Sequence, residues 1–271
     1  MKKISIVTVT YNCEKAIKET ILSVLAQDYS CLEYVIIDGA SKDSTLSIIQ
    51  SFGDKIHKIV SEKDKGIFDA MNKSLAYITG EYVLFMNAGD TFVNSHVVSD
   101  IFNSYNGNDD LIYGDDYVRN DLGYLFRKAS SIYQSQYTKR DLVFKSQGFS
   151  HQSLFTKVSL LRKIKFNLAY PLGADYHTTW QIYELNHSIK YVNMPISIFD
   201  DREGGASHKK GFIDEIYLER ITMFSYQLKI IDKLFICFMR YKVNFRYRFL
   251  AMFPSFTARY RNFKRNYVSK L

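Results

Sequence analysis

The stretch KISIVTVTYNCEKAIKETILSVLAQDYSCLEYVIID, residues 3–38, indicates the fold class of this chain. Residues 3–10 are apolar and rich in β-branched side chains, which is typical of a buried strand. Residues 14–27 repeat apolar side chains at helical spacing, and residues 32–38 form a second apolar run. A strand, a helix and a second strand in this order predict two parallel strands joined by a crossover helix.

The same alternation continues toward the C-terminus. Helices are predicted at residues 41–52 and 66–78, and strands at residues 55–60 and 81–86. This pattern predicts an α/β fold with a doubly wound, mostly parallel sheet up to about residue 105. Further along, the sequence predicts a hairpin that turns at Asn120–Asp121, helices at 156–164 and 173–186, a strand at 189–194 and a helical region from Phe212 onward.

Composition favours a globular protein of a reducing compartment. Apolar residues make up 46% of the chain and aromatic residues 15%, which suits a packed core. Cys13, Cys31 and Cys237 are scattered without paired spacing, so we expect free thiols. The apolar run at the N-terminus is too short for a secretory signal, and no run approaches the roughly 18 residues of a spanning helix. We therefore expect a cytoplasmic location.

The positive charge is concentrated at the C-terminus. Residues 229–271 contain eleven Lys or Arg and one acid, Asp232, so residues 1–228 carry a small net negative charge within a total of +8. Basic and aromatic side chains alternate there, as in segments that bind the headgroups of anionic membranes. Packing on the chain's own core or on a second subunit is the alternative. Because no nucleic-acid motif is present, we expect a peripheral membrane partner on the inner face of the cytoplasmic membrane, and no nucleic acid.

Polar residues follow each predicted strand of the first half, where the carboxyl ends of parallel strands meet. Five carboxylates lie at these positions and can approach one crevice: Asp38, Asp43, Glu62, Asp64 and Asp90. Such a concentration is costly unless a cation or hydrogen-bond donors compensate it. A nucleotide offers donors on its base and ribose, and a divalent ion can join a carboxylate to a diphosphate.

Neither familiar phosphate loop is present. A dinucleotide site would place a GxGxxG motif after the first strand, but residues 10–16 read TYNCEKA, and no Walker A motif occurs. The pattern therefore favours a nucleotide whose phosphates are held by a metal ion.

Seven short stretches, in this order and spacing, resemble the inverting family 2 glycosyltransferases, and most closely the branch that assembles bacterial polysaccharides. They are SIVTVTYN (5–12), VIIDGASKDST (35–45), SEKDKGIFDAMNKSL (61–75), FMNAGD (85–90), HQSLF (151–155), GADYHTTWQI (173–182) and GGAS (204–207). The resemblance covers roughly residues 3–210. It implies a Rossmann-like GT-A fold with a nucleotide-binding half (1–105), a merged acceptor-binding half (106–228) and the helical basic tail (229–271).

The resemblance also implies roles for residues of the nucleotide-binding half. Thr10, Tyr11 and Asn12 would contact the nucleotide, with the first two against its base. Asp38 would hold the base or ribose, although a turn before Gly39 also explains an aspartate there. Further on, the resemblance places Asp64, Lys65 and Asn87 on the nucleotide as well, while a solvated loop would also explain the first two.

Asp90 would be the metal ligand, because it is the last carboxylate of the family's DXD-type motif. Asn87 and Gly89 stand where many relatives have aspartates, so one carboxylate would hold Mn²⁺ or Mg²⁺ together with water and phosphate oxygens.

The resemblance assigns the chemistry to the second half. Asp175 would be the general base, at a position where the family often has Glu-Asp and this chain has Ala174–Asp175. A carboxylate at the start of a helix also has a structural explanation, because the helix N-terminus stabilises it. His151 and Gln152 would lie on the acceptor or phosphate side of the site, or be structural.

These residues predict a metal-dependent inverting glycosyltransferase that uses a nucleoside-diphosphate sugar, with UDP-sugars as the family's commonest donors. The acceptor would be a saccharide or a lipid-linked molecule in surface polysaccharide assembly. Two alternatives remain open. A sugar nucleotidyltransferase would need a Gly-rich loop after the first strand, and a non-catalytic membrane-associated adaptor would retain the fold alone.

Overall fold

The computed structural model describes residues 1–121, 123–129, 148–185, 187–202 and 212–223, together with residues 230, 231, 234, 235, 237, 238 and 241. The chain divides into two compact units: Met1–Tyr137 with Lys145–Phe212, and Thr138–Phe144 with Ile213–Leu271. The second unit contains nearly all of α8 (Phe212–Met223). The first unit contains the sheet and the site residues. The predicted boundary between residues 228 and 229 stays a prediction.

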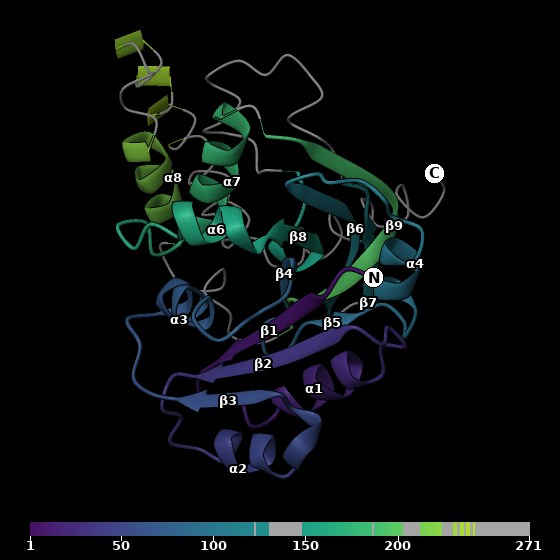
Figure 1. Ribbon diagram of the computed structural model, residues 1–271. Coiled ribbons are helices and arrows are strands. Elements are labelled where there is room, and N and C mark those ends of the chain that lie inside the picture. The colour runs from purple at the N-terminus through teal and green to yellow at the C-terminus, as the bar shows by residue number, and fades with distance from the viewer. Residues whose placement is uncertain are drawn as a thin grey trace. The chain divides into compact units, whose positions relative to one another are not determined.

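The first half of the sheet follows the predicted alternation (Figure 1). Its elements are β1 (Ile4–Thr10), α1 (Ile17–Leu25), β2 (Leu32–Asp38), α2 (Thr45–Gln50), η1 (Gly53–Lys55), β3 (Lys58–Ser61), α3 (Ile67–Ser74) and β4 (Tyr82–Phe85). β1 pairs in parallel with β2 and β4, and β2 pairs in parallel with β3. The strand order β3-β2-β1-β4 confirms a doubly wound sheet whose direction of winding reverses beside β1.

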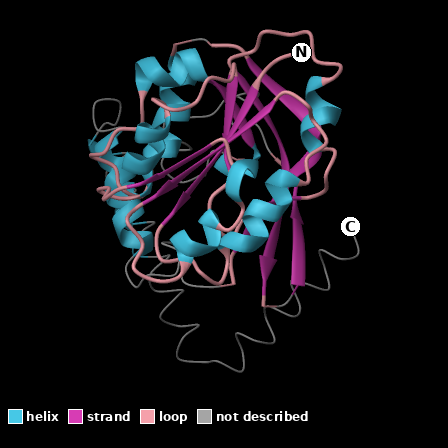
Figure 2. Ribbon diagram, turned by 60° about the horizontal axis from the view of Figure 1, so that its bottom comes forward, coloured by secondary structure: helices cyan, strands magenta, loops and turns pink. Residues whose placement is uncertain are grey.

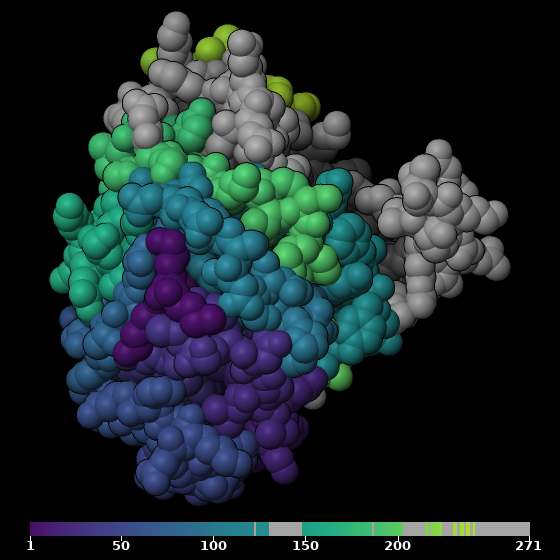
Figure 3. Space-filling model, turned by 45° about the vertical axis from the view of Figure 1, so that its right-hand side comes forward, coloured from purple at the N-terminus to yellow at the C-terminus, as the bar shows by residue number. Residues whose placement is uncertain are grey.

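The second half continues the same sheet. Its elements are β5 (Thr91–Phe92), α4 (Val97–Phe102), β6 (Leu111–Asn120), β7 (Gly123–Arg127), η2 (His151–Ser153), β8 (Leu154–Lys157), α6 (Val158–Ile164), α7 (Ala174–Glu184) and β9 (Ile189–Asp200). β8 lies antiparallel between β4 and β6, and so joins the two halves. β6 pairs in parallel with β9, and among the described residues nine strands form one sheet. In Figure 3, residues of the two halves form one continuous surface (purple to green).

Helices cover both faces of this sheet (Figure 2). On one face, apolar residues of α1, α2 and α4 pack with Ile4, Ile6 and Tyr34 in one buried cluster. On the other face, residues of α3 and α6 pack with Val7 and Val9 in a second cluster. Because β1 is buried on both sides, the polar residues at its carboxyl end can face only the rim of the sheet.

The hairpin at Asn120–Asp121 is confirmed, because β6 and β7 pair antiparallel with Asn120 opposite Gly123. The predicted helix 156–164 begins two residues later, since residues 154–157 form β8. The strand predicted at 189–194 runs on to Asp200, because Pro195 lies at an irregularity of the β6–β9 ladder, where a proline is tolerated. β5 and α4 are short elements that the sequence pattern did not predict.

Within the part of the chain that the structure describes, no helix has both the length and the apolar character needed to cross a bilayer. Residues 203–211, with the GGAS stretch, and most of the predicted tail lie outside the described residues.

Candidate functional site

Asp38 lies fully buried at the carboxyl end of β2. Its carboxylate accepts hydrogen bonds from the Ser41 backbone N–H (3.1 Å), the Ser41 hydroxyl and the Ser61 hydroxyl (2.6 Å). These bonds tie the loop after β2 to the end of β3. Asp38 therefore shapes the rim of the sheet from beneath.

Tyr11 and Asp64 both lie close to the backbone of Gly39, which has no side chain between them. A methyl group on Gly39 would lie 2.5 Å from Asp64 Oδ2 and 3.4 Å from a ring carbon of Tyr11, so any larger residue would displace the Asp64 carboxylate. Tyr11 is 53% exposed, and Asp64 is half-buried with its Oδ1 accepting the Gly66 N–H. The neighbouring Lys65 is exposed. An exposed aromatic ring and a carboxylate therefore lie on either side of the Gly39 backbone. This arrangement suits a planar nucleotide base that carries an N–H donor.

Thr10 and Asn12 flank this ring. The hydroxyl oxygen of Thr10 is buried and has no hydrogen-bond partner among the described residues. Asn12 adopts a left-handed backbone conformation (φ 51°), and its Oδ1 accepts the Lys42 N–H at 2.8 Å. Asn12 thus joins the loops after β1 and β2, while Thr10 leaves one buried polar atom available at the rim.

An open cleft of about 780 Å³ begins at these residues. Its lining consists of Tyr11, Asn12, Cys13, Glu14, Lys15, Ala16, Glu19, Asp43, Ala88, Gly89, Asp121, Asp200 and Arg202. The cleft therefore runs from the loop after β1 to the turn after β4 and the end of β9.

The turn after β4 holds Asp90. Gly89 has a positive φ of 107°, which permits the tight turn, and the Asp90 N–H donates to the Asn87 carbonyl at 3.0 Å. Asp90 is only 4% exposed. Its two carboxylate oxygens accept hydrogen bonds from Gln152 Nε2 (2.8 Å) and from the Asp200 backbone N–H (3.0 Å). Burial raises the pKa of Asp90 to about 6, and these two hydrogen bonds offset only part of the rise.

Asp200 connects Asp90 to two arginines that the sequence analysis did not single out. Its carboxylate pairs with Arg119 (2.9 Å) and with Arg202 (2.8 Å). Burial raises the pKa of Asp200, but the bonds from Arg202 and Arg119 outweigh it and lower the pKa to about 2. Arg119 also binds Glu19 on α1. The strand was predicted only to residue 194, so the sequence pattern gave no signal that Asp200 and Arg202 lie beside Asp90.

A divalent metal at Asp90 is consistent with the described donors, although no three His, Cys, Asp or Glu side chains among the described residues form a cluster for one. Each carboxylate oxygen of Asp90 accepts one hydrogen bond and keeps a lone pair. In the same turn, Asn87 Oδ1 is buried with no hydrogen-bond partner among the described residues. The turn therefore fits an ion whose remaining ligands are phosphate and water oxygens.

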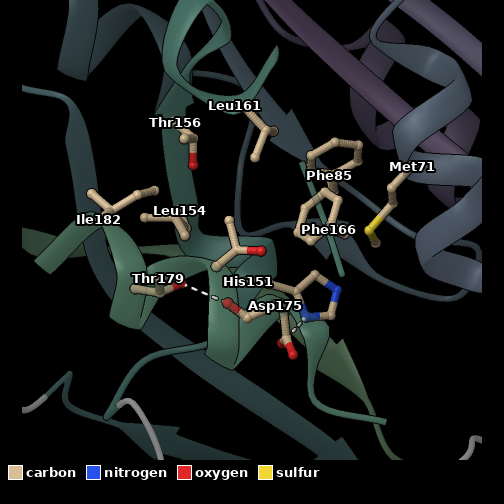
Figure 4. Close-up of a pocket in the computed structure, with 11 residues that line it drawn as sticks. Met71, Phe85, His151, Leu154, Thr156, Leu161, Phe166, Asp175, Thr179 and Ile182 are labelled. Atoms are coloured by element: carbon tan, nitrogen blue, oxygen red, sulfur yellow. Dashed lines mark hydrogen bonds and ion pairs between the residues drawn. The ribbon is translucent and has the colours of Figure 1, made fainter. Parts of the chain in front are cut away.

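Asn87 leads to the second polar group of the site. Its amide nitrogen lies 2.7 Å from His151 Nε2, and His151 Nδ1 lies 3.5 Å from Asp175 Oδ2. Asp175 occupies the first turn of α7, with its Oδ1 accepting the Tyr176 N–H. Figure 4 shows the imidazole of His151 beside the carboxylate of Asp175 at the edge of a small cavity of about 20 Å³, whose other walls are mostly apolar.

The structure thus brings together one part of the predicted set and separates another. His151 and Gln152, on the η2 turn, connect the β4 turn to α7 and to Asp90. The five carboxylates, in contrast, do not share one crevice. Asp38 is buried beneath the rim, and the exposed Glu62 pairs with Lys73 at 2.9 Å. Asp38, Asp43, Glu62 and Asp64 each have their own local donors, so no cation shared by all five carboxylates is required to offset their charge.

Comparison with known sequences identifies the chain. A sequence model of the family described as glycosyl transferase family 2 matches residues 5–165, more than half of its length. The chain belongs to this family. The matched region ends one residue after α6, so it contains the rim of the sheet, the Asp90 turn and η2. The glycosyltransferase activity expected from the sequence is thereby confirmed.

Relatives of this family 2 glycosyltransferase resemble it over most of its length. The "PGL/p-HBAD biosynthesis glycosyltransferase" of Mycobacterium bovis (strain BCG / Pasteur 1173P2) is 25% identical over 226 residues, which cover 81% of this chain and 84% of the relative. "Glycosyltransferase GlyA" of Streptococcus pneumoniae serotype 4 is 22% identical, over 76% of this chain and 31% of its own.

Solved structures show the same fold. The crystal structure of "S. aureus TarS 1-349 in complex with UDP-GlcNAc" superposes with a TM-score of 0.61 at 23% identity, and covers 81% of this chain and 66% of that one. A crystal structure of glucosyl-3-phosphoglycerate synthase from Mycobacterium tuberculosis in complex with Mn²⁺ and UDP superposes with a TM-score of 0.56 at 18% identity, over 82% of this chain and 80% of that one. These likenesses confirm the GT-A type α/β fold.

Proposed function

We propose that this glycosyltransferase transfers a sugar from a nucleoside-diphosphate donor, with inversion at the anomeric carbon, and that a divalent ion assists the reaction. The observation that carries the proposal is the chain of contacts from Asn87, in the turn that carries Asp90, through His151 to Asp175. It joins a polar turn suited to a diphosphate to a partly exposed carboxylate suited to proton transfer.

The donor would occupy the cleft that begins at Tyr11. The exposed ring of Tyr11, the Asp64 carboxylate and the unpaired Thr10 hydroxyl would take the nucleoside, with Asn12 and Lys65 at the edge of this site. A uracil base matches this set, because it offers an N–H donor and carbonyl acceptors on one flat ring. The UDP and UDP-GlcNAc complexes of the structural relatives support a UDP-sugar.

Asp90 and the amide oxygen of Asn87 would hold the metal, Mn²⁺ or Mg²⁺, at the diphosphate. When bound, the ion supplies positive charge that stabilises the leaving nucleoside diphosphate. Gln152 would keep Asp90 oriented through its hydrogen bond of 2.8 Å. Arg202, two residues after β9, offers a second positive charge on the wall of the cleft.

Asp175 would act as the general base. The acceptor hydroxyl gives its proton to the Asp175 carboxylate, and its oxygen forms a bond to the anomeric carbon. The bond from that carbon to the phosphate oxygen breaks, and its electron pair leaves with the nucleoside diphosphate. Attack from the face opposite the leaving group inverts the configuration. The side chain of Asp175 is 22% exposed, so an acceptor hydroxyl can reach it.

The proposal is tested with a panel of UDP- and GDP-sugars, with and without Mn²⁺, by following the release of nucleoside diphosphate. The Asp175→Asn variant should bind the donor as the wild type does, while kcat falls by about 10²-fold or more. Equal losses of donor binding and turnover would mark Asp175 as structural. Absence of both binding and turnover with every donor would favour a non-catalytic protein.

The acceptor side of the proposal includes a membrane surface. In the second unit, the described side chains of Ile230, Leu234 and Phe238 recur at helical spacing and are 78%, 64% and 61% exposed. Basic residues, including Lys229, Lys233 and Arg240, alternate with them in sequence. Exposed apolar side chains beside basic ones favour the interface of an anionic bilayer. A lipid-linked saccharide of surface polysaccharide assembly would be the matching acceptor.

The membrane part has its own test. The full chain should sediment with vesicles that contain phosphatidylglycerol, much less with neutral vesicles, and progressively less as salt screens the charges. A chain that ends at Leu228 should stay in the supernatant and still bind the donor. If the full chain ignores anionic vesicles, the tail packs on protein instead, and the acceptor reaches the site from solution.

A further inference from the structure

His151 lies on a turn that is fixed on both sides. The hydroxyl of Ser150 bonds the buried carboxylate of Asp116 at 2.7 Å, and Gln152 bonds Asp90 at 2.8 Å. Ser153 donates to the Asp115 carbonyl at 3.0 Å. Bonds to three different residues thus hold the turn, so the fold sets where the side chain of His151 begins, and its contacts with Asn87 and Asp175 orient the ring.

The contact with Asn87 determines which ring nitrogen carries the proton. The amide nitrogen of Asn87, 2.7 Å from His151 Nε2, is a donor only, so Nε2 must accept. A neutral imidazole that accepts at Nε2 carries its proton on Nδ1. Nδ1 faces Asp175 Oδ2 at 3.5 Å. Asn87 therefore directs an N–H group of His151 toward the Asp175 carboxylate.

We propose that His151 is a positioning residue for the Asp175 carboxylate, with Asn87 fixing its tautomer; this inference rests on the proposed role of Asp175 as the base. The backbone N–H of Tyr176 donates to one oxygen of Asp175, and His151 Nδ1 faces the other at 3.5 Å. The distance of 3.5 Å is longer than an ordinary N–H···O bond, as catalytic hydrogen bonds often are when no substrate is bound. The carboxylate then presents its remaining lone pair to the acceptor hydroxyl, while the donor-side turn is linked to the base.

The kinetic test uses the difference between the two ring nitrogens. An Asn side chain carries its amide nitrogen as many bonds from the backbone as Nδ1, whereas Gln carries it as far as Nε2. His151→Ala and His151→Gln should lower kcat about ten- to a hundred-fold with little change in the donor KM, the order expected for a lost hydrogen bond to a charged group. His151→Asn should recover most of kcat. If His151→Gln recovers activity and His151→Asn does not, the ring serves Asn87 alone, and the inference is wrong.

A second His–Asp pair supplies a matched control. His187 Nδ1 lies 2.9 Å from Asp110 Oδ2, and the two side chains have exposures similar to those of His151 and Asp175. His187→Ala should leave kcat unchanged. In an Asp175→Asn background, His151→Ala should cost almost nothing further, because the carboxylate it positions is gone. If Asp175→Asn keeps full turnover, the proposed base fails. If Asp175→Asn loses turnover and His151→Ala does not, only the present inference fails.

A spectroscopic test does not depend on finding the right donor. In ¹⁵N-histidine-labelled full-length protein, the His151 signals are assigned by their loss in His151→Asn. The expected tautomer carries its proton on Nδ1, and Asn87→Ala should shift it toward the commoner Nε2–H form. A proton on Nε2 in the wild type would overturn the inference, whatever the kinetics show.

Discussion

Two buried carboxylates lie at opposite ends of the parallel strands β1, β2 and β4, and their hydrogen-bond partners differ. Glu33, near the start of β2, and Asp90, after β4, are 6% and 4% exposed. Glu33 accepts hydrogen bonds from Ser5 Oγ (2.6 Å) and from the Thr79 N–H (2.7 Å), and Lys3 lies 3.2 Å away. Burial raises the pKa of Glu33, but these donors outweigh it and lower the pKa to about 2, while Asp90 rises to about 6.

Under the proposed function, the difference separates a structural carboxylate from one that binds a ligand. Near Glu33, the hydroxyls of Ser5 and Thr79 both donate to its carboxylate. Neither side chain has a buried polar atom without a partner. At the Asp90 edge, Thr10 Oγ1 and Asn87 Oδ1 are buried without partners among the described residues. Unpaired buried atoms are rare in folded proteins, so these two support the proposal that a ligand binds at the carboxyl ends of the strands.

Removing the charge of Asp90 is the most direct test of the difference between Asp90 and Glu33. Asp90→Asn keeps the shape of the side chain and an oxygen that accepts one hydrogen bond. We expect kcat to fall by about 10²- to 10³-fold, because the charge that would hold the metal at the leaving group is lost. Thermal unfolding with UDP should show that Mn²⁺ no longer adds to the stabilisation by the nucleotide.

The same variant should fold normally without ligand, because a buried carboxylate with a raised pKa contributes no stability at pH 7. A large drop in the melting temperature of the free Asp90→Asn protein, with normal activity per folded molecule, would contradict the assignment. Asp90 would then belong with Glu33 among the structural carboxylates.

Glu33→Gln is the converse experiment. We expect a loss of about 2 kcal/mol in the free energy of unfolding at pH 7, because a charged acceptor with several donors is replaced by a neutral one. The pKa of Glu33 is lowered in the folded state to about 2, so its stabilisation is complete above the ordinary pKa of 4.5 and is lost as the pH falls toward 2. Denaturant unfolding at several pH values measures this, and the two proteins should converge toward low pH.

Activity per folded molecule is the matching control. Glu33 lies at the edge remote from the proposed donor site, so kcat and KM of Glu33→Gln should equal those of the wild type. A variant that kept its stability but lost turnover would show that burial and partners do not distinguish the two edges.

Local periodicity explains why the first half of the fold was predictable. β1 to β4 and α1 to α3 alternate along the chain, and each short crossover fixes the order of neighbouring strands, so apolar spacing alone specifies them. β8 and β9 depend on distant partners instead. β8 is a four-residue strand that exists because β4 and β6 lie on either side of it, and no local pattern reveals this.

Part of the site was also predictable from local sequence patterns. Residues that directly follow strands, such as Tyr11 and Asp90, could be placed at the rim from the sequence. The link from Gln152 to Asp90, and the ion pairs of Arg119, join residues 62 to 100 positions apart. Such contacts depend on how the two halves meet, which apolar periodicity does not encode.

Two threonines of β1 provide a comparison within one strand. Thr8 and Thr10 are both buried, and both side chains lie on the same face of the strand because they are two residues apart. Thr8 Oγ1 bonds the Tyr34 hydroxyl (2.9 Å) and the Met86 carbonyl (2.8 Å). Thr10 Oγ1 has no partner among the described residues. A substitution that removes only the hydroxyl should therefore have different consequences at the two positions.

We expect Thr8→Val to lower the free energy of unfolding by about 1 kcal/mol, because it leaves the buried Tyr34 hydroxyl without its partner. Thr10→Val should leave stability unchanged or raise it by about 1 kcal/mol, since it replaces an unpaired buried hydroxyl with a methyl group of the same shape. The affinity for UDP should show the opposite order: Thr10→Val weakens binding several-fold and Thr8→Val does not. Calorimetric titration with UDP and denaturant unfolding of both variants measure the two effects. Thr10→Val could instead destabilise the free protein and bind UDP normally. The Thr10 hydroxyl would then have a partner within the protein, and it would not indicate where a ligand binds.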